Sequence, residues 1–192
     1  MPASLRYSLA ARLHERWRQY AENRRGAAAV EFAMIAVPFF FMIFGLIEVC
    51  MIFIASSVLD HAVYEASRPI RTGGVQRESL DKDEFRATVC ERFYNLMDCN
   101  NLLHVDVRTI NRFGLTPNGI PTDAAGNIDP GLLTYNPGGP AEIVAVRVFY
   151  EWPLFTPVIS RPLVNMPGNK HLLHSAAVFR NEPFTSGGGL SE

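Results

Sequence analysis

A glycine at a charge boundary, followed by a single carboxylate, is the feature of this sequence that most suggests chemistry. Gly26 separates a basic stretch from a long apolar one, and Glu31 is the first acidic residue inside the apolar stretch. Placing an ionised side chain in hydrocarbon costs about 2.5–3.5 kcal/mol, and such residues usually mark a function. Glu31 can instead lie at headgroup depth, solvated and without a role. The residue types alone leave both interpretations open.

The apolar stretch itself predicts a membrane-spanning helix. It runs from Ala27 to Ala55, and as a helix it would measure about 43 Å, which is enough to cross a bilayer and project beyond it. A buried helix of a soluble protein is seldom apolar on every face over such a length. A cleavable secretory signal fits poorly, because its basic and apolar regions are usually shorter. The pair Arg24-Arg25 is only weakly like a twin-arginine signal, since Glu31 would be unusual in one.

The distribution of charge predicts the orientation of this helix. The whole chain has 192 residues and a net charge of −1, which gives no global reason to expect nucleic acid as a partner. Arginines dominate the first 25 residues, so the positive-inside rule places the N-terminus in the cytoplasm and the chain from about residue 60 onward outside it. In the same leader, apolar residues recur near one helical face, which predicts a basic amphipathic helix on the membrane surface; they are Leu5, Leu9, Leu13, Trp17 and Tyr20.

The sequence around Gly26 resembles the processing site of the type IV pilin superfamily. In GAAAVEF, four residues separate the glycine from Glu31-Phe32 at the start of a long apolar helix. The resemblance implies that a prepilin peptidase cuts between Gly26 and Ala27. The cut would create an α-ammonium that enters apolar surroundings when subunits pack together. Glu31 is then expected to pair with the amine of a neighbouring subunit, and Phe32 to pack beside it.

Within that superfamily the chain is most similar to TadE-like proteins. The Ala-Ala-Ala-Val-Glu-Phe start, the run through Pro38 into three phenylalanines, and the R-N-E-P sequence at residues 180–183 carry this resemblance. It implies a minor pilin-like subunit, or pseudopilin, of an adhesive Tad/Flp pilus, in the inner membrane with a periplasmic head. The implied partners are the prepilin peptidase, other pilin and pseudopilin subunits, the inner-membrane assembly platform and the lipid bilayer. The alternative is an unprocessed single-pass membrane protein whose periplasmic domain binds a partner or ligand.

Three further residues of the apolar stretch have structural interpretations. Pro38 is expected to kink the helix modestly, as membrane helices tolerate proline. Glu48 lies near the far membrane face, and a carboxylate reaching out to the headgroups is favoured over a second subunit contact. Cys50 is expected to be a small apolar filler.

The elements beyond the membrane predict an α+β fold. Apolar residues from Val58 to Ala66 keep helical spacing, so the long helix should continue as a stem towards Pro69 and Gly73-Gly74. A second helix should start between Leu80 and Asp83. Strands are predicted at 103–109, 142–152 and 171–180, and an antiparallel sheet of about three strands packed on the stem is the simplest arrangement. The connection 114–140 is expected to be a mobile loop, and 153–170 a second irregular one.

These elements divide the chain into five expected segments. They are a basic cytoplasmic leader at 1–26, a transmembrane helix at 27–55, a periplasmic helical stem at 56–72, a periplasmic α+β head at 73–184 and a flexible tail at 185–192.

The head offers one covalent site and no recognisable catalytic one. Cys90 and Cys99 form the only cysteine pair outside the membrane, and a disulfide is expected provided that the second helix ends before Cys99. His171 and His174 should lie on opposite faces of a strand with no further metal ligand nearby. The sequence contains no nucleophile elbow, phosphate-binding glycine loop or zinc spacing. We therefore expect no cofactor and no enzymatic activity.

Overall fold

The computed structural model describes residues 24–93, 97–99, 101–114, 119–156 and 159–185. The chain divides into two compact units, Met1–Leu46 and Ile47–Glu192, which are described separately below. The amphipathic leader predicted from the first residues lies outside the described part, as does most of the predicted tail.

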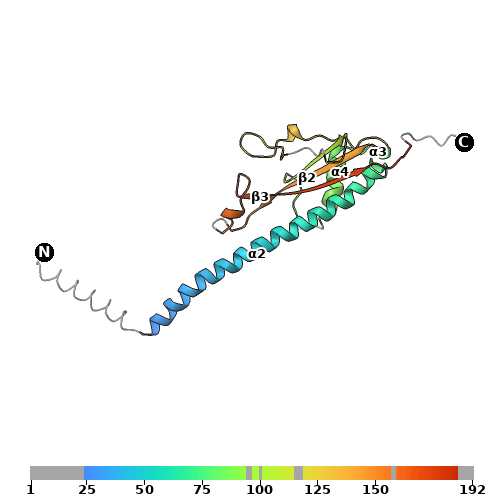
Figure 1. Ribbon diagram of the computed structural model, residues 1–192. Coiled ribbons are helices and arrows are strands. Elements are labelled where there is room, and N and C mark those ends of the chain that lie inside the picture. The colour runs from blue at the N-terminus through green and yellow to red at the C-terminus, as the bar shows by residue number, and fades with distance from the viewer. Residues whose placement is uncertain (1–23, 94–96, 100, 115–118, 157–158, 186–192) are drawn as a thin grey trace, which may run out of the picture. The chain divides into compact units, whose positions relative to one another are not determined.

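The dominant element is the helix α2, Arg24–Arg71 (Figure 1). Within the described residues it is the one helix that is long and apolar enough to cross a membrane. It includes the predicted transmembrane and stem segments and remains helical through Pro38. It also continues through Pro69 to Arg71, because a proline so near the end removes only one hydrogen bond of the last turns. The Thr72 N–H then closes the helix on the Arg68 carbonyl at 3.0 Å.

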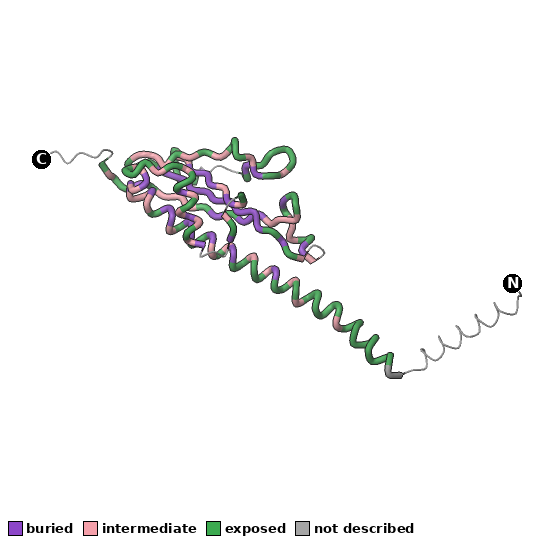
Figure 2. Tube along the Cα trace, turned by 180° about the vertical axis from the view of Figure 1, so that it is seen from behind, coloured by how far each residue is buried: buried purple, intermediate pink, exposed green. Residues whose placement is uncertain are grey.

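The first unit contributes the N-terminal part of α2 to the described structure, and nearly all of its residues are exposed (Figure 2). Large apolar side chains point outward around the whole helix; they include Val30, Phe32, Met34, Ile35, Val37, Phe39, Phe40, Phe41 and Phe44. A helix that is apolar on all sides without a protein cover is stable in a lipid environment or within a bundle of similar helices.

The second unit is built around an antiparallel sheet of three strands in the order β1-β2-β3. The strands are β1, Leu103–Ile110, β2, Ile143–Pro153, and β3, Lys170–Arg180. Leu103 pairs with Tyr150 across β1 and β2, and Ile143 pairs with Arg180 across β2 and β3. The predicted α+β class, with a long helix and a three-stranded antiparallel sheet, is confirmed.

The main core lies between α2, the sheet and the short helix α4, Lys82–Glu91. α2 contributes one face of small and medium apolar side chains with spacings of three or four residues; they are Ala55, Leu59, Ala62, Ala66 and Ile70. α4 begins with a capping box between Asp81 and Glu84 and contributes Phe85 and Val89. The helix α3, Gly74–Glu78, connects α2 to α4 and was not predicted.

Irregular segments cover the other face of the sheet. Phe149 of β2 packs there with Ile128, Met166 and Leu172. In its described residues, the predicted loop after β1 contains a 3-10 turn at Pro130–Leu132 and an isolated β-bridge between Thr122 and Ile128. Its described residues are nevertheless attached to β1, because the Val107 N–H binds the Thr134 carbonyl at 2.8 Å. The second connection carries the 3-10 turn Arg161–Leu163. These connections cover the face of β2 that is turned away from α2, which explains why β2 is buried on both faces.

Candidate functional site

Gly26 and Ala27 lie in the first turn of α2, which begins at Arg24. A Cβ atom added at Gly26 would meet no described atom within 4 Å outside the neighbouring residues of its own helix. The first backbone N–H groups of a helix lack intrahelical acceptors, and glycine costs about 0.5–1 kcal/mol relative to alanine in a helix. The Gly26–Ala27 peptide bond therefore lies where α2 can unwind at low cost, as a protease that binds extended backbone would require.

Glu31 and Phe32 follow on the exposed surface of the same helix, and Phe32 is 71% exposed. Helix geometry makes Ala27 and Glu31, at i and i+4, neighbours on one face. The carboxylate thus lies beside the residue that would carry a new amine. Pro38 lies further along continuous α2, and its kink stays a prediction.

Glu48 has a different environment from the one expected. It belongs to the second unit and is only 4% exposed. Its carboxylate accepts hydrogen bonds from the Phe155 N–H at 2.7 Å, from the Thr156 N–H at 3.2 Å and from the Thr156 hydroxyl group. Glu48 therefore makes an internal contact with a loop of the head, rather than reaching out to headgroups as predicted. No local pattern could have shown this, because the partners lie more than a hundred residues apart.

A buried ion pair on the sheet was also missed. Asp106 is fully buried, and its Oδ2 binds Nη2 of Arg147 at 2.6 Å. Its Oδ1 binds Nη2 of Arg108 at 2.6 Å and the Thr134 N–H at 2.9 Å. Burial opposes ionisation of Asp106, but the hydrogen bonds from Arg108, Thr134 and Arg147 outweigh it and lower the pKa of this carboxyl group below its usual value. Only the strand register, which pairs Asp106 with Arg147, could have shown this.

The disulfide joins Cys90 and Cys99, whose Cα atoms are 6.0 Å apart. It is possible because α4 ends at Glu91, well before Cys99. Of the two histidines of β3, His171 has its Nδ1 in a hydrogen bond with the Leu163 carbonyl, and His174 is exposed. Within the described ranges, no three His, Cys, Asp or Glu side chains are placed to share a metal ion.

The R-N-E-P sequence connects the end of β3 to the end of α2. The buried Asn181 side chain donates to the carbonyls of Pro137 and Gly139 at 3.0 and 2.9 Å. The Glu182 N–H binds the Arg71 carbonyl at 2.8 Å. This sequence therefore closes the head against the C-terminal end of α2.

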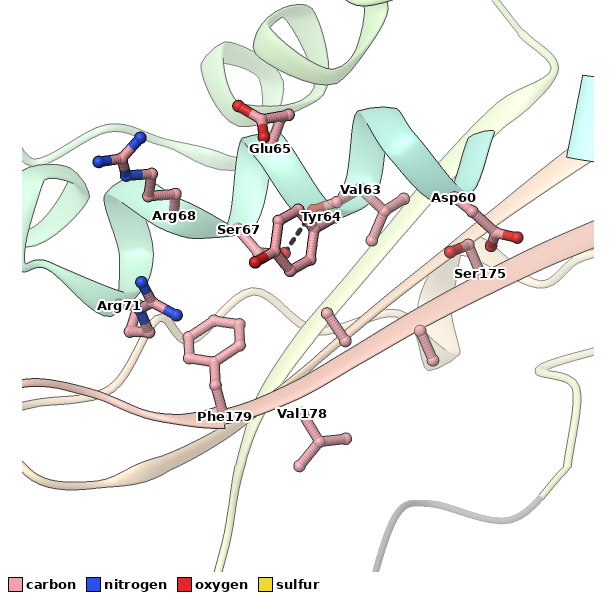
Figure 3. Close-up of a pocket in the computed structure, with 12 residues that line it drawn as sticks. Asp60, Val63, Tyr64, Glu65, Ser67, Arg68, Arg71, Ser175, Val178 and Phe179 are labelled. Atoms are coloured by element: carbon pink, nitrogen blue, oxygen red, sulfur yellow. Dashed lines mark hydrogen bonds between the residues drawn. The ribbon is translucent and has the colours of Figure 1, made fainter. Parts of the chain in front are cut away.

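A groove of about 760 Å³ lies between α2 and β3 within the second unit (Figure 3). Tyr64 and Phe179 project from its two sides, and the Ser67 hydroxyl group is turned back to the Val63 carbonyl at 2.6 Å. Two of its charged residues already have partners in the chain, since Glu65 lies 3.6 Å from Arg92 and Arg71 lies 3.6 Å from Glu182.

In the described residues, these observations define a protein with one helix long and apolar enough to span a membrane and an α+β head. A protein-family model described as TadE-like protein matches residues 26–68. The match begins at Gly26 and covers most of α2, so the TadE resemblance of this segment is confirmed. The R-N-E-P sequence lies outside the matched segment. No curated protein and no solved structure was found to match the chain.

Proposed function

We propose that this chain is a minor, pilin-like subunit that serves assembly of a tight-adherence pilus and that a prepilin peptidase cuts it between Gly26 and Ala27. The observation that carries the proposal is the TadE match that starts at Gly26, on a helix whose apolar surface is uncovered in its first unit. Such a helix needs lipid before assembly and can pack against other subunit helices afterwards.

The position of Glu31 supports processing rather than simple anchoring. An anchor gains nothing from a carboxylate one helical turn into its apolar segment, where it opposes insertion. A cut subunit has a positive charge to neutralise at Ala27. Glu31 can meet the amine of its own chain, at i and i+4, or that of a neighbouring subunit, and either contact reduces the cost of burying both charges.

In this proposal the chain spans the inner membrane once, with the leader in the cytoplasm and the head in the periplasm. Its partners are the prepilin peptidase, other pilin or pseudopilin subunits and the assembly platform, and it has no enzymatic activity of its own. The disulfide between Cys90 and Cys99 supports an oxidising location for the head.

Substitution at Gly26 tests processing without disturbing the fold. Since a Cβ atom at Gly26 would meet no described atom outside its own helical turn, Gly26→Leu should leave the chain folded and should block cleavage through the peptidase alone. Ala29→Leu adds the same side chain to an exposed position after the cut and is the matched control. After co-expression with a prepilin peptidase, intact mass should show cleavage of the control and the wild type but not of Gly26→Leu.

The runner-up function predicts a different pattern. An uncut membrane protein with a ligand-binding head would keep residues 1–26 in all three chains. Its wild-type chain and its Gly26→Leu variant would also support piliation equally well, so pilus counts in a complemented deletion strain separate the two functions.

A further inference from the structure

The surface of α2 changes from apolar to polar at a definable level within the second unit. Its exposed large apolar side chains there are Ile47, Met51, Phe53 and Ile54. The first exposed charged residue after them is Asp60. Between Ile54 and Asp60 the helix rises about 9 Å. If α2 crosses a bilayer, the apolar environment must therefore extend at least to the level of Ile54.

The loop after β2 is attached to α2 at Glu48, within the part of the helix that exposes apolar side chains. Glu48 holds it through two backbone N–H groups and a hydroxyl group, those of Phe155 and Thr156. Glu48 precedes Ile54 by six residues, or about 9 Å along α2, and precedes Asp60 by about 18 Å. A loop attached to Glu48 thus lies at the depth of the exposed apolar residues and not beside the polar part of the stem.

The side chain at the tip of this contact is suited to lipid. Phe155 is 68% exposed, although its neighbours Trp152 and Leu154 are buried. Its ring packs edge-on against Trp152 with the centroids 6.3 Å apart, so it is supported from behind and faces outward. Phenylalanine, with tryptophan and leucine, is typical of apolar surfaces that enter the boundary between the headgroups and acyl chains of a bilayer.

The contact with Glu48 also reduces the cost of placing a loop at that depth. Irregular backbone is excluded from apolar surroundings because each unsatisfied N–H or C=O group costs several kcal/mol. Here the N–H groups of Phe155 and Thr156 are both bound by the Glu48 carboxylate. In return, these donors satisfy a buried carboxylate that would otherwise oppose burial.

We infer that residues Leu154–Thr156 form a membrane-contacting loop, with Phe155 inserted in the interfacial layer of the bilayer and Glu48 fixing its depth. The occupant of this surface is lipid, because the exposed aromatic continues the apolar surface of α2 at the same level. The head would then have two attachments to the membrane, α2 and this loop, which restrict its rotation about the helix axis. The inference rests on the proposed membrane placement of α2.

Depth-dependent fluorescence quenching tests this placement in the full chain. In a Cys50→Ala background the disulfide leaves no other free thiol, so Phe155→Cys can be labelled with bimane. The labelled chain is reconstituted in phosphatidylethanolamine–phosphatidylglycerol vesicles with nitroxides on the headgroup or the acyl chain. Leu46→Cys, in the apolar segment, and Tyr64→Cys, exposed on the polar stem, are the reference positions.

The inference predicts severalfold less quenching by aqueous iodide at position 155 than at position 64, and strong quenching by lipid nitroxides. If position 155 behaves like position 64 while position 46 is protected, the loop does not contact lipid and the inference is wrong, although the membrane anchor stands. If iodide also quenches the label at position 46, α2 does not lie in the bilayer. The proposed membrane placement of α2 and the inference that rests on it are then both wrong.

A second variant tests whether the protection at position 155 depends on Glu48 or comes from the label itself. Glu48→Ala removes the acceptor of the loop and should raise iodide access at position 155 without changing it at position 46. Unchanged protection of position 155 would show that Glu48 does not set the depth of the loop.

Discussion

Glu31 and Glu48 stand on one apolar helix but have opposite environments. Glu48 is buried and accepts three hydrogen bonds from its own chain. Glu31 is exposed on the uncovered part of α2. Both carboxylates would be costly in lipid without compensation. Because Glu48 is compensated internally, Glu31 is the one that remains available for a contact with the processed N-terminus or another subunit.

The role of Glu31 is tested by separating cleavage from assembly. Glu31→Ala should leave cleavage after Gly26 largely intact, because Glu31 lies four residues beyond the peptide bond that is cut. It should abolish piliation and co-purification with other pilus subunits, because the new amine loses its carboxylate partner. Immunoblots of cleaved chain together with pilus counts measure the two effects.

Glu31→Gln provides the matched control, since it keeps shape and hydrogen-bonding capacity but not charge. It should also lose most piliation if an ion pair is required. Normal pili in the Glu31→Ala strain would exclude an assembly role for this residue.

Asp106 should set part of the acid sensitivity of the head. Its pKa is lower in the folded chain than the ordinary value of about 3.9, so its ionised form stabilises the fold above pH 4. That contribution is lost as the pH falls below 4 towards the folded-state value. Asp106→Asn should lower the free energy of unfolding at pH 7 by about 3–5 kcal/mol, because Arg147 is left without its buried counter-charge.

Chemical unfolding of the full chain in detergent micelles, followed by circular dichroism from pH 7 to pH 3, measures this effect. The variant should lose less stability on acidification than the wild type. Asp83→Asn changes an exposed aspartate of α4 and should alter neither quantity. Equal acid sensitivity of the wild type and Asp106→Asn would show that other groups control it.

At the scale of elements, the end of α2 depends on one glycine. Gly73 has a φ of +78°, and a Cβ atom there would collide with the Phe184 ring that covers it. Both effects disfavour any other residue. Gly73→Ala should therefore destabilise the head by about 1–2 kcal/mol and release Phe184 from the end of α2.

The neighbouring glycine supplies the control for that substitution. A Cβ atom at Gly74 would lie at ordinary contact distances, 3.4 Å or more, from Pro69. Gly74→Ala should be neutral or slightly stabilising, because it restricts the unfolded chain. Melting temperatures of both variants in detergent micelles compare the two, and equal values would contradict the predicted closure of the head over Gly73.

The sequence was informative about these elements for a physical reason. α2 is long and uniformly apolar in its first half, and β1 alternates apolar and polar residues, so each has a local signature. The helix at Lys82–Glu91 has both a capping box and apolar spacing. Such patterns are read within a short window, and they were sufficient for the α+β class.

The contacts between elements could not be predicted in this way. Glu48 meets Phe155, and Asp106 meets Arg147, only because the chain brings distant residues together. The distance along the chain between the partners of each pair follows no known pattern. A buried charged residue also cannot be told from a solvated one by its sequence alone. The close packing of the loop after β1 was likewise missed, because its Gly, Pro and Asn content indicates turns but not what the turns cover.

At the scale of the whole molecule, the chain combines two units with different surfaces. Residues 24–46 expose apolar surface that needs lipid or other helices, whereas the unit from Ile47 has its own core. In the proposed function, the leader presents the Gly26–Ala27 bond to the peptidase, which then removes the leader. The same apolar helix then becomes the surface on which subunits assemble.

The proposed processing is decided by the mass of the chain recovered from cells with an active prepilin peptidase. A processed subunit should be recovered as a species that begins at Ala27 and retains the rest of the chain. Recovery of only the full-length chain, in cells where the peptidase is shown to cut another pilin, would contradict the proposal.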